Sequence, residues 1–386
     1  MAVQQKDLIR IAFRDTLASK ADDSLDWASL KGILQACNPE VCTEAKLEAL
    51  IRTAVEENLA DSAGPDAKVK LEPFLSWLLG ADRPIKGAVE EGIQSLVLVG
   101  YGPVAHGFLT RLLEVSPFPC RFDLTVVCEE PYHAYNRVKL STFFEHRTVD
   151  KLAYSGEEWC AKNGVRVVFG RADRIDRDKR TVEVALSGGG SETLRYDELV
   201  LATGSSPFVP REPAGLGDTP GVFVYRTVGD CQAIIGYAQG RTKAAVIGGG
   251  LLGLEAAKAV RDLGLEVAVV ELAPALLVAQ VDREAGGVVR QKVEALGVRV
   301  HTGAKILEVL RAADGSVSGL RIEEGGVVSE IEAQMVIVSA GIRPRHELAE
   351  ACGLELGPRG GVKVDGSLRS VSDASVRAIG EVASVD

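Results

Sequence analysis

The sequence predicts an α/β protein with parallel sheets, preceded by a small all-α module. Two observations support this prediction. From residue 93 onward, short apolar runs of strand length alternate with helical stretches, a pattern that is typical of α/β units. Residues 1–85 instead carry apolar residues at helical spacing, and a helical segment recurs within them. The 386 residues are enough for two or three domains.

Composition and charge argue against several classes of protein. Hydrophobic residues make up 46% of the chain and charged residues 25%, so packed cores are expected rather than wholesale disorder. The net charge of −10 argues against a surface for nucleic acid or anionic membrane, because such a surface needs a basic patch. No apolar run approaches the ~18 residues of a membrane helix. Asp7 and Asp15 argue against a transit peptide, and we expect a cytoplasmic protein.

The cysteines form no complete redox or metal motif. Cys37 and Cys42 have the spacing of part of a ferredoxin cluster, but the next cysteine is Cys120, so the rest of that motif is missing. No two cysteines are spaced C-x-x-C, which disfavours a disulfide reductase that uses a tight redox pair. We expect no metal site, and we expect most of the thiols to pack in cores.

An internal repeat organises residues 1–85. "LIRIAFRDTLA" (8–18) recurs as "LIRTAVEENLA" (50–60), and each copy is followed by a polar loop and another apolar helical stretch. The pattern predicts a duplicated helix–loop–helix with a faint resemblance to a paired EF-hand. Ser29 and Pro73 stand where such calcium loops need a Glu, so a structural or docking role is favoured. Residues 80–92 are predicted to be a linker.

The α/β part begins with a strand that leads into a glycine-rich turn. In "VLVGYGPVAHGF", Gly100, Gly102 and Ala105 form the pattern G-x-G-x-x-A. The first glycine allows the turn, the second lets a pyrophosphate approach the backbone, and the small third residue lets the helix pack on the strand. The next predicted strand ends at Glu129, where a carboxylate can accept hydrogen bonds from an adenosine ribose.

A second turn of the same kind follows a later strand. In "AVIGGGLLGLEAA", Gly248, Gly250 and Gly253 form G-x-G-x-x-G, and the next strand ends at Glu271. Two complete motifs predict two dinucleotide sites. The Glu271 carboxylate would repel a 2′-phosphate and no Arg follows it directly, so NADH is favoured over NADPH. The predicted strands are 94–100, 122–129, 165–170, 197–204, 243–250, 265–271, 298–303 and 333–341.

Three further segments make a family resemblance specific: "ELVLATGSSPFVP" (198–210), "VIVSAGIRPR" (336–345) and "VRAIGEVA" (376–383). With them, the chain resembles the two-dinucleotide-binding flavoproteins of the pyridine nucleotide-disulfide oxidoreductase superfamily. Within that superfamily, residues 93–386 resemble the N-terminal flavin module of the NAD(P)H-dependent assimilatory nitrite reductase large subunit. The resemblance implies two Rossmann-like domains that bind FAD and NADH, with the NAD domain inserted in the FAD domain.

The resemblance also implies domain boundaries. The helical module would occupy 1–85, the FAD-binding domain 93–235 and 333–386, and the inserted NAD-binding domain 236–332.

The same resemblance assigns roles to single residues around the FAD. Thr203, Gly204 and Gly341 match the turns at which the chain leaves and re-enters the FAD domain. Gly380 and Glu381 match the motif that touches the FAD ribitol, with Glu where many relatives have Asp.

Other residues are assigned by position. Arg137 would lie against the pyrophosphate or adenine, and Pro103 and Ala172 complete the cofactor-binding set. Lys139 is predicted to be solvated, and Thr142 stands where ferredoxin-reductase-like relatives often place a Lys beside the flavin.

Glu255 has two interpretations. In relatives, an acid at the matching position lies near the bound nicotinamide. Alternatively, Glu255 is a carboxylate near a helix N-terminus that the helix dipole stabilises.

Three functional hypotheses follow. The first is an FAD-dependent NADH:acceptor oxidoreductase in which the flavin carries the chemistry, so no catalytic side chain is named. Its acceptor is unknown and could be an iron–sulfur or sirohaem protein. The second is a non-catalytic docking protein, and the third a standalone ferredoxin- or rubredoxin-reductase-like enzyme. The chain has no clustered cysteines for iron–sulfur and sirohaem sites, so we do not expect it to reduce nitrite unaided.

The position of the last residue bears on these hypotheses. Relatives continue with a helix after the position of Glu381, whereas this sequence ends at Asp386. A fragment, a subunit that a partner completes and a degenerate copy are all consistent with that ending.

Overall fold

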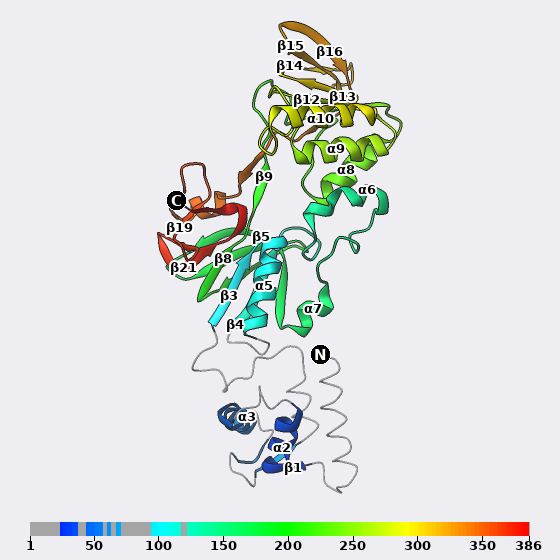
Figure 1. Cartoon of the computed structure of the whole chain (residues 1–386). Helices are drawn as coiled ribbons and strands as arrows, with labels where there is room; N and C mark the ends of the chain where they lie inside the picture. Colours follow the sequence, from blue (N-terminus) through cyan, green and yellow to red (C-terminus); the bar gives the residue numbers. More distant parts are fainter. Residues whose placement is uncertain are drawn as a thin grey trace.

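The computed structural model describes residues 24–37, 44–56, 60–62, 67–70, 94–116 and 122–385, and Figure 1 shows their arrangement. The two largest sheets of the α/β part are each flanked by helices, as the sequence predicts. The predicted helix at 8–18 and the predicted linker at 80–92 lie outside the described residues. None of the described helices is long and apolar enough to cross a membrane.

The N-terminal module contains strands as well as helices. Its described elements are β1 (Ser24–Asp26), α2 (Trp27–Cys37), α3 (Glu44–Glu56) and β2 (Lys68–Lys70). β1 and β2 pair antiparallel, with Leu25 opposite Val69. The all-α prediction is therefore not confirmed, because the loop residues of the two repeats pair with each other through their backbones. Buried Trp27, Leu30 and Ile51 supply apolar contacts within this small module.

The first α/β unit is built on a sheet of ten strands in the order β22-β19-β20-β21-β8-β3-β4-β5-β6-β7. The five neighbouring strands from β21 to β5 run parallel, and α5 (Pro103–Val115) connects β3 to β4. The parallel strands are β3 (Gln94–Val99), β4 (Phe122–Cys128), β5 (Val165–Asp176), β8 (Glu198–Leu201) and β21 (Asp373–Ala378). The remaining strands, which flank this parallel part on its two sides, are β6 (Thr181–Leu186), β7 (Ser191–Arg195), β19 (Val362–Val364), β20 (Arg369–Ser370) and β22 (Ala383–Val385).

The second unit is built on five parallel strands in the order β10-β17-β11-β12-β13. These are β10 (Val222–Val224), β11 (Lys243–Ile247), β12 (Glu266–Glu271), β13 (Arg299–Thr302) and β17 (Met335–Val338). Its helices are α8 (Val228–Ala238), α9 (Leu251–Asp262) and α10 (Arg283–Ala295). An antiparallel sheet of β14 (Ala304–Arg311), β15 (Val317–Glu324) and β16 (Val327–Glu332) lies beside them.

The two parallel sheets repeat one strand order. In each unit the strand that leads into the glycine turn, β3 or β11, has the next strand along the chain on one side and a much later strand, β8 or β17, on the other. Such a reversal opens a crevice at the carboxyl ends of the strands, where α/β proteins bind ligands. All the predicted strands are confirmed. Their nearly continuous apolar sequences are explained by burial on both faces, as in β17, whose four residues are all buried.

The chain passes between the units through a short antiparallel ribbon. β9 (Ser205–Pro207) pairs with β18 (Ile342–Pro344) at this crossing. β10, α8 and β17 belong to the second sheet and its core. The predicted domain boundaries, between 235 and 236 and between 332 and 333, would instead place β10, β17 and most of α8 in the FAD-binding domain. The exact division into domains stays a prediction.

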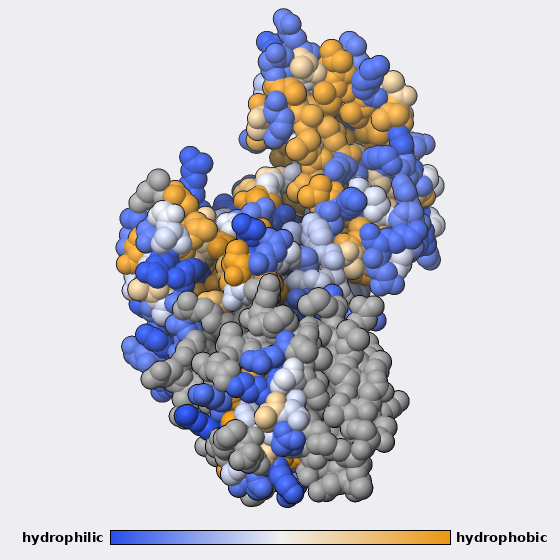
Figure 2. Space-filling view, turned by 60° about the horizontal axis from the view of Figure 1, so that its bottom comes forward, coloured by the Kyte–Doolittle hydropathy of each residue, from blue (hydrophilic) through white to orange (hydrophobic). Residues whose placement is uncertain are grey.

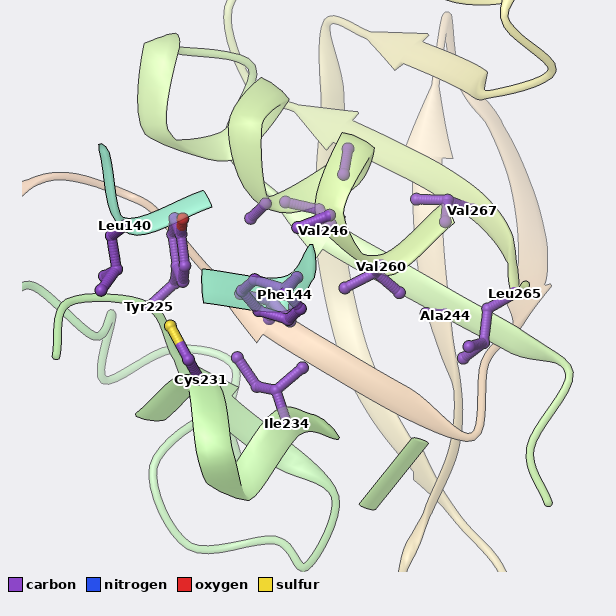
Figure 3. Close-up of a cluster of buried hydrophobic side chains, with 14 of the residues drawn as sticks. Leu140, Phe144, Tyr225, Cys231, Ile234, Ala244, Val246, Val260, Leu265 and Val267 are labelled. Carbon is purple, nitrogen blue, oxygen red and sulfur yellow. The ribbon is translucent and has the colours of Figure 1, made fainter. Parts of the chain in front are cut away.

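An apolar cluster joins the two units. The segment after β4 forms a 3-10 helix, η1 (Arg137–Thr142), and then α6 (Phe143–His146), which pack on α9 and α8 of the second unit. Phe144 and Leu140 approach Ile234 and Tyr225 in this cluster (Figure 3). Figure 2 shows an indentation between the units, with apolar residues on the wall that the second unit forms.

We predict that Phe144→Ala destabilises the protein far more than Val138→Ala. The Phe144 side chain is 7% exposed and its ring lies 6.0 Å from that of Tyr225, whereas Val138 is 79% exposed. Truncating a buried Phe costs about 3–5 kcal/mol, and truncating an exposed residue changes stability by less than ~0.5 kcal/mol. Urea unfolding followed by circular dichroism measures both. Equal midpoints would show that the cluster does not stabilise the contact between the units.

Candidate dinucleotide-binding site

The first glycine turn lies at the crevice of the first unit, between β3 and α5. Gly100 has φ +102°, and a Cβ there would lie 2.4 Å from the carbonyl oxygen of Ala202, which follows β8. A side chain is therefore excluded, because the two turns are in backbone contact. Ala105 lies in α5 and is 1% exposed, as expected for the small residue of the motif.

The second turn has the same construction. Gly248 has φ +111°, and its Cβ would lie 2.2 Å from the carbonyl oxygen of Ser339, which follows β17. A Cβ on Gly253 would lie 2.0 Å from the carbonyl oxygen of Gly248, so this glycine lets α9 pack on its strand. The middle residue, Gly249, was not predicted but is also constrained, since its Cβ would lie 2.5 Å from a methyl group of Leu276.

No contact within the described residues requires glycine at the two remaining motif positions, Gly102 and Gly250. A Cβ on Gly102 or Gly250 would meet no atom within 4 Å. Both residues are helix N-caps without a side-chain cap, and Pro103 opens α5. Backbone N–H groups in the first turn of both helices, from Val104 onward in α5 because Pro103 has none, are therefore available to an anion. The open space above each glycine is where a pyrophosphate would approach. The residues present fit a dinucleotide at both turns.

The two predicted ribose-binding acids have different surroundings. Glu271 accepts hydrogen bonds from the backbone N–H groups of Gly249 at 2.5 Å and Ala273 at 2.6 Å, which fix its carboxylate beside the second turn. Glu129 instead forms an ion pair with Arg345, whose Nη1 lies 2.7 Å from Glu129 Oε2. Sequence reasoning did not single out Arg345, because its partner is distant along the chain.

A second ion pair lies beside the turn that follows β8. Glu381, in the 3-10 turn η2 (Gly380–Val382), binds the guanidinium of Arg226, and the Ser205 hydroxyl donates to Glu381 Oε2 at 2.7 Å. Gly204 adjoins this group, since its Cβ would lie 3.8 Å from the same Oε2 atom. Arg226 and Ser205 were not predicted.

The predicted turn residues gather around this crevice. Thr203 Oγ1 donates to the carbonyl oxygen of Arg345 at 2.7 Å. Gly341 and Gly380 both have positive φ, and a Cβ on Gly380 would lie 3.2 Å from Val104 of α5. Ala172 lies within β5 opposite Val184 and packs against the core of the first unit, so no contact here links it to the turns.

The expected contact of Arg137 with the pyrophosphate or adenine stays a prediction, and within the protein this side chain has other partners. Its guanidinium binds Glu130, donates to the carbonyl oxygen of Arg226 at 3.0 Å and lies 5.1 Å from the ring centroid of Tyr135. These partners lie at the junction of the two units. Lys139 is exposed, and Thr142 Oγ1 donates to the carbonyl oxygen of Lys139 at 2.8 Å.

Four cysteines of the α/β part are packing residues in this structure. Cys128, Cys160 and Cys231 are buried and free, and Cys352 is half-buried and free. Burial raises the pKa of the Cys128 thiol to about 12, so this side chain is neutral at neutral pH.

Glu255, in the second turn of α9, is half-buried, and this burial raises its pKa above the usual glutamate value. The position therefore favours the neutral carboxyl group. The two interpretations of Glu255 both remain open on these observations.

Comparisons with known proteins support the same interpretation of the fold. A family model described as "Pyridine nucleotide-disulphide oxidoreductase" matches residues 94–386. The chain is 42% identical over 290 residues to the nitrite reductase (NADH) large subunit of Escherichia coli, covering 75% of this chain and 33% of that protein. It is 33% identical to rhodocoxin reductase of Rhodococcus erythropolis, covering 75% of this chain and 65% of the relative.

A solved structure shows the same arrangement. The ferredoxin reductase for the CYP199A2 system from Rhodopseudomonas palustris superposes with a TM-score of 0.66 and 27% identity, covering 76% of this chain and 69% of that one. The chain spans about a third of the length of the nitrite reductases that it matches.

We predict that Gly253→Ala destabilises the protein whereas Gly250→Ala does not. The added methyl group would overlap the Gly248 carbonyl in the first variant and meets open space in the second. Forced overlap of this kind costs typically ~1–3 kcal/mol. Thermal unfolding without ligand measures the effect. A common midpoint for the two variants would mean that the α9 contact is not as close as described.

We also predict that Glu255→Gln gains stability relative to the wild type as pH rises. The raised pKa means that the folded state favours the protonated form, so its stabilising effect is present at low pH and is lost as pH rises through the folded-state pKa. The uncharged amide has no such loss. Urea midpoints from acidic to neutral pH provide the measurement. If the urea midpoint of Glu255→Gln instead falls relative to that of the wild type as pH rises, Glu255 is a carboxylate that the helix dipole stabilises.

Proposed function

The chain belongs to the pyridine nucleotide-disulphide oxidoreductase family, and on this premise we propose that it is an electron-entry module. In this proposal NADH binds the second unit, FAD binds the first, and the electrons leave to an external acceptor. The carrying observation is the pair of glycine turns, each closed by backbone contact and open above its N-cap glycine. An electron-entry role needs both sites in one chain, and a simple nucleotide-binding protein needs only one.

The protein's contribution is to bind and orient. The N-termini of α5 and α9 supply unpaired N–H groups for the two diphosphates. Glu129 and Glu271 stand at the strand ends where ribose hydroxyls can donate to them. When bound, a flavin accepts a hydride from a reduced nicotinamide and passes electrons on singly or in pairs.

Glu271 supports NADH as the reductant. Its carboxylate is held in place by the N–H groups of Gly249 and Ala273. A fixed negative charge beside the ribose repels a 2′-phosphate, and the following residues, Leu272 and Ala273, offer no compensating cation.

The acceptor is proposed by class only. The names of relatives include a nitrite reductase large subunit, a rhodocoxin reductase and an assimilatory nitrate reductase electron transfer subunit of Bacillus subtilis, which is 30% identical over 75% of this chain. These names favour another redox protein as the acceptor, and an iron–sulfur or sirohaem protein is the class that we propose. Nitrate assimilation, which the name of the Bacillus subtilis relative indicates, is the process that we propose for this chain.

The test is anaerobic reduction of the reconstituted chain. After incubation with FAD and desalting, we expect a visible flavin band that bleaches with NADH and much more slowly with NADPH. Glu271→Ser should narrow the difference between the two reductants, since it removes the charge that repels the 2′-phosphate. Gly250→Ala should retain flavin but slow bleaching, because its methyl group enters the space for the pyrophosphate.

Two outcomes would contradict the proposal. A chain that retains no flavin would favour a non-catalytic docking protein. A retained flavin that NADH does not bleach would mean that the second unit does not deliver electrons to the first.

A further inference from the structure

The family resemblance placed Arg137 against the pyrophosphate or adenine of the cofactor, but two of its guanidinium donors bind groups of the protein. The guanidinium binds Glu130 through Nη2, and its Nη1 donates to the carbonyl oxygen of Arg226. Glu130 also accepts from the hydroxyl of Tyr135 at 2.7 Å, and the Arg137 side chain is 27% exposed. These contacts place the charge of Arg137 in the junction between the units, where it neutralises Glu130.

A different arginine is held at the first crevice. Arg345 is fixed through its backbone, since its N–H donates to the carbonyl oxygen of Gly204 at 2.9 Å and its own carbonyl accepts from Thr203 Oγ1 at 2.7 Å. The Ala202–Gly204 turn that anchors it is the turn against which Gly100 packs. Arg345 therefore belongs to the same rim as the first glycine turn.

The side chain of Arg345 is oriented by Glu129. Its Nη1 lies 2.7 Å from Glu129 Oε2, and the two side chains are 41% and 46% exposed. The pair is thus open to solvent, with guanidinium donors left for another anion. A carboxylate has about four acceptor positions, so Glu129 can hold Arg345 and a ribose hydroxyl together.

We propose that Arg345, and not Arg137, is the cation that binds the diphosphate of the FAD, with Glu129 as its positioning residue; this inference rests on the proposed function. A planar guanidinium with several donors suits phosphate oxygens. The N-terminus of α5 supplies only partial positive charge, so a full cation beside the neighbouring Ala202–Gly204 turn complements it. The Glu129–Arg345 pair is neutral as a unit and does not repel the cofactor.

The experiment compares three alanine variants in the full chain stripped of flavin. We expect Arg345→Ala to weaken FAD binding ~10- to 100-fold, the usual effect of losing hydrogen bonds to a charged group. Its backbone contacts are independent of the side chain, so the variant should fold. Arg343→Ala is the matched control, because Arg343 is exposed, has the same charge and lies over the ring of Phe208 at 4.4 Å. It should leave the Kd unchanged.

Arg137→Ala separates the two assignments. We expect it to lower the urea midpoint, since Glu130 loses its partner, while the Kd for FAD stays near that of the wild type. Quenching of flavin fluorescence gives the Kd. Competition by ADP, which carries the diphosphate without the flavin, should be weakened by Arg345→Ala to the same extent as FAD binding.

Two results with the variants would overturn the inference. A loss of affinity in Arg137→Ala with none in Arg345→Ala would restore the assignment made by resemblance. Tighter binding by Arg345→Ala would mean that Arg345 competes with the ribose for Glu129. Wild-type chain that binds no FAD would instead overturn the proposed function itself, so the two failures are distinguishable.

Discussion

The close approach of backbone to backbone at the two glycine turns is the constraint on which the site depends. Gly100 and Gly248 each contact the carbonyl of a turn that follows a much later strand, Ala202 in one case and Ser339 in the other. This contact is available only because β8 and β17 lie beside β3 and β11. It closes the base of each crevice and leaves the helix N-terminus as the open side.

Charge is distributed around the first crevice in two pairs. Arg345 with Glu129 and Arg226 with Glu381 link strand ends and turns that are far apart in the chain. Both pairs are partly exposed, so each contributes little to stability by itself, about 0–1 kcal/mol. Their consequence is geometric: they fix where positive and negative groups stand at the mouth of the site.

The junction between the units bears on electron transfer in the proposed function. α6 and α8 share an apolar cluster, and Arg137 joins Glu130 to the backbone of Arg226, whose side chain reaches Glu381. The residues that connect the second unit to the first are thus linked, through a hydrogen bond and ion pairs, to residues at the first crevice. Loss of this contact would change the distance between the two cofactors without altering either binding turn.

The sequence by itself determined the features that depend only on short segments of the chain. The glycine spacing and the acids at the strand ends were readable in advance, because each depends on residues within one β-turn-α unit. The confirmed strands follow from the same local patterns. In the N-terminal module, however, the antiparallel pairing of Leu25 with Val69 joined two repeats, and local helical periodicity gave no sign of it.

Only the tertiary structure decided which arginine lies beside the first glycine turn and where the chain passes from one sheet to the other. Sequence reasoning singled out Arg137 and not Arg345, although both are basic residues next to a motif. Their partners, Glu130 with the Arg226 carbonyl and Glu129 with the Ala202–Gly204 turn, depend on how distant strands lie side by side. Ion pairs form between groups that folding brings together, so spacing along the chain does not specify them.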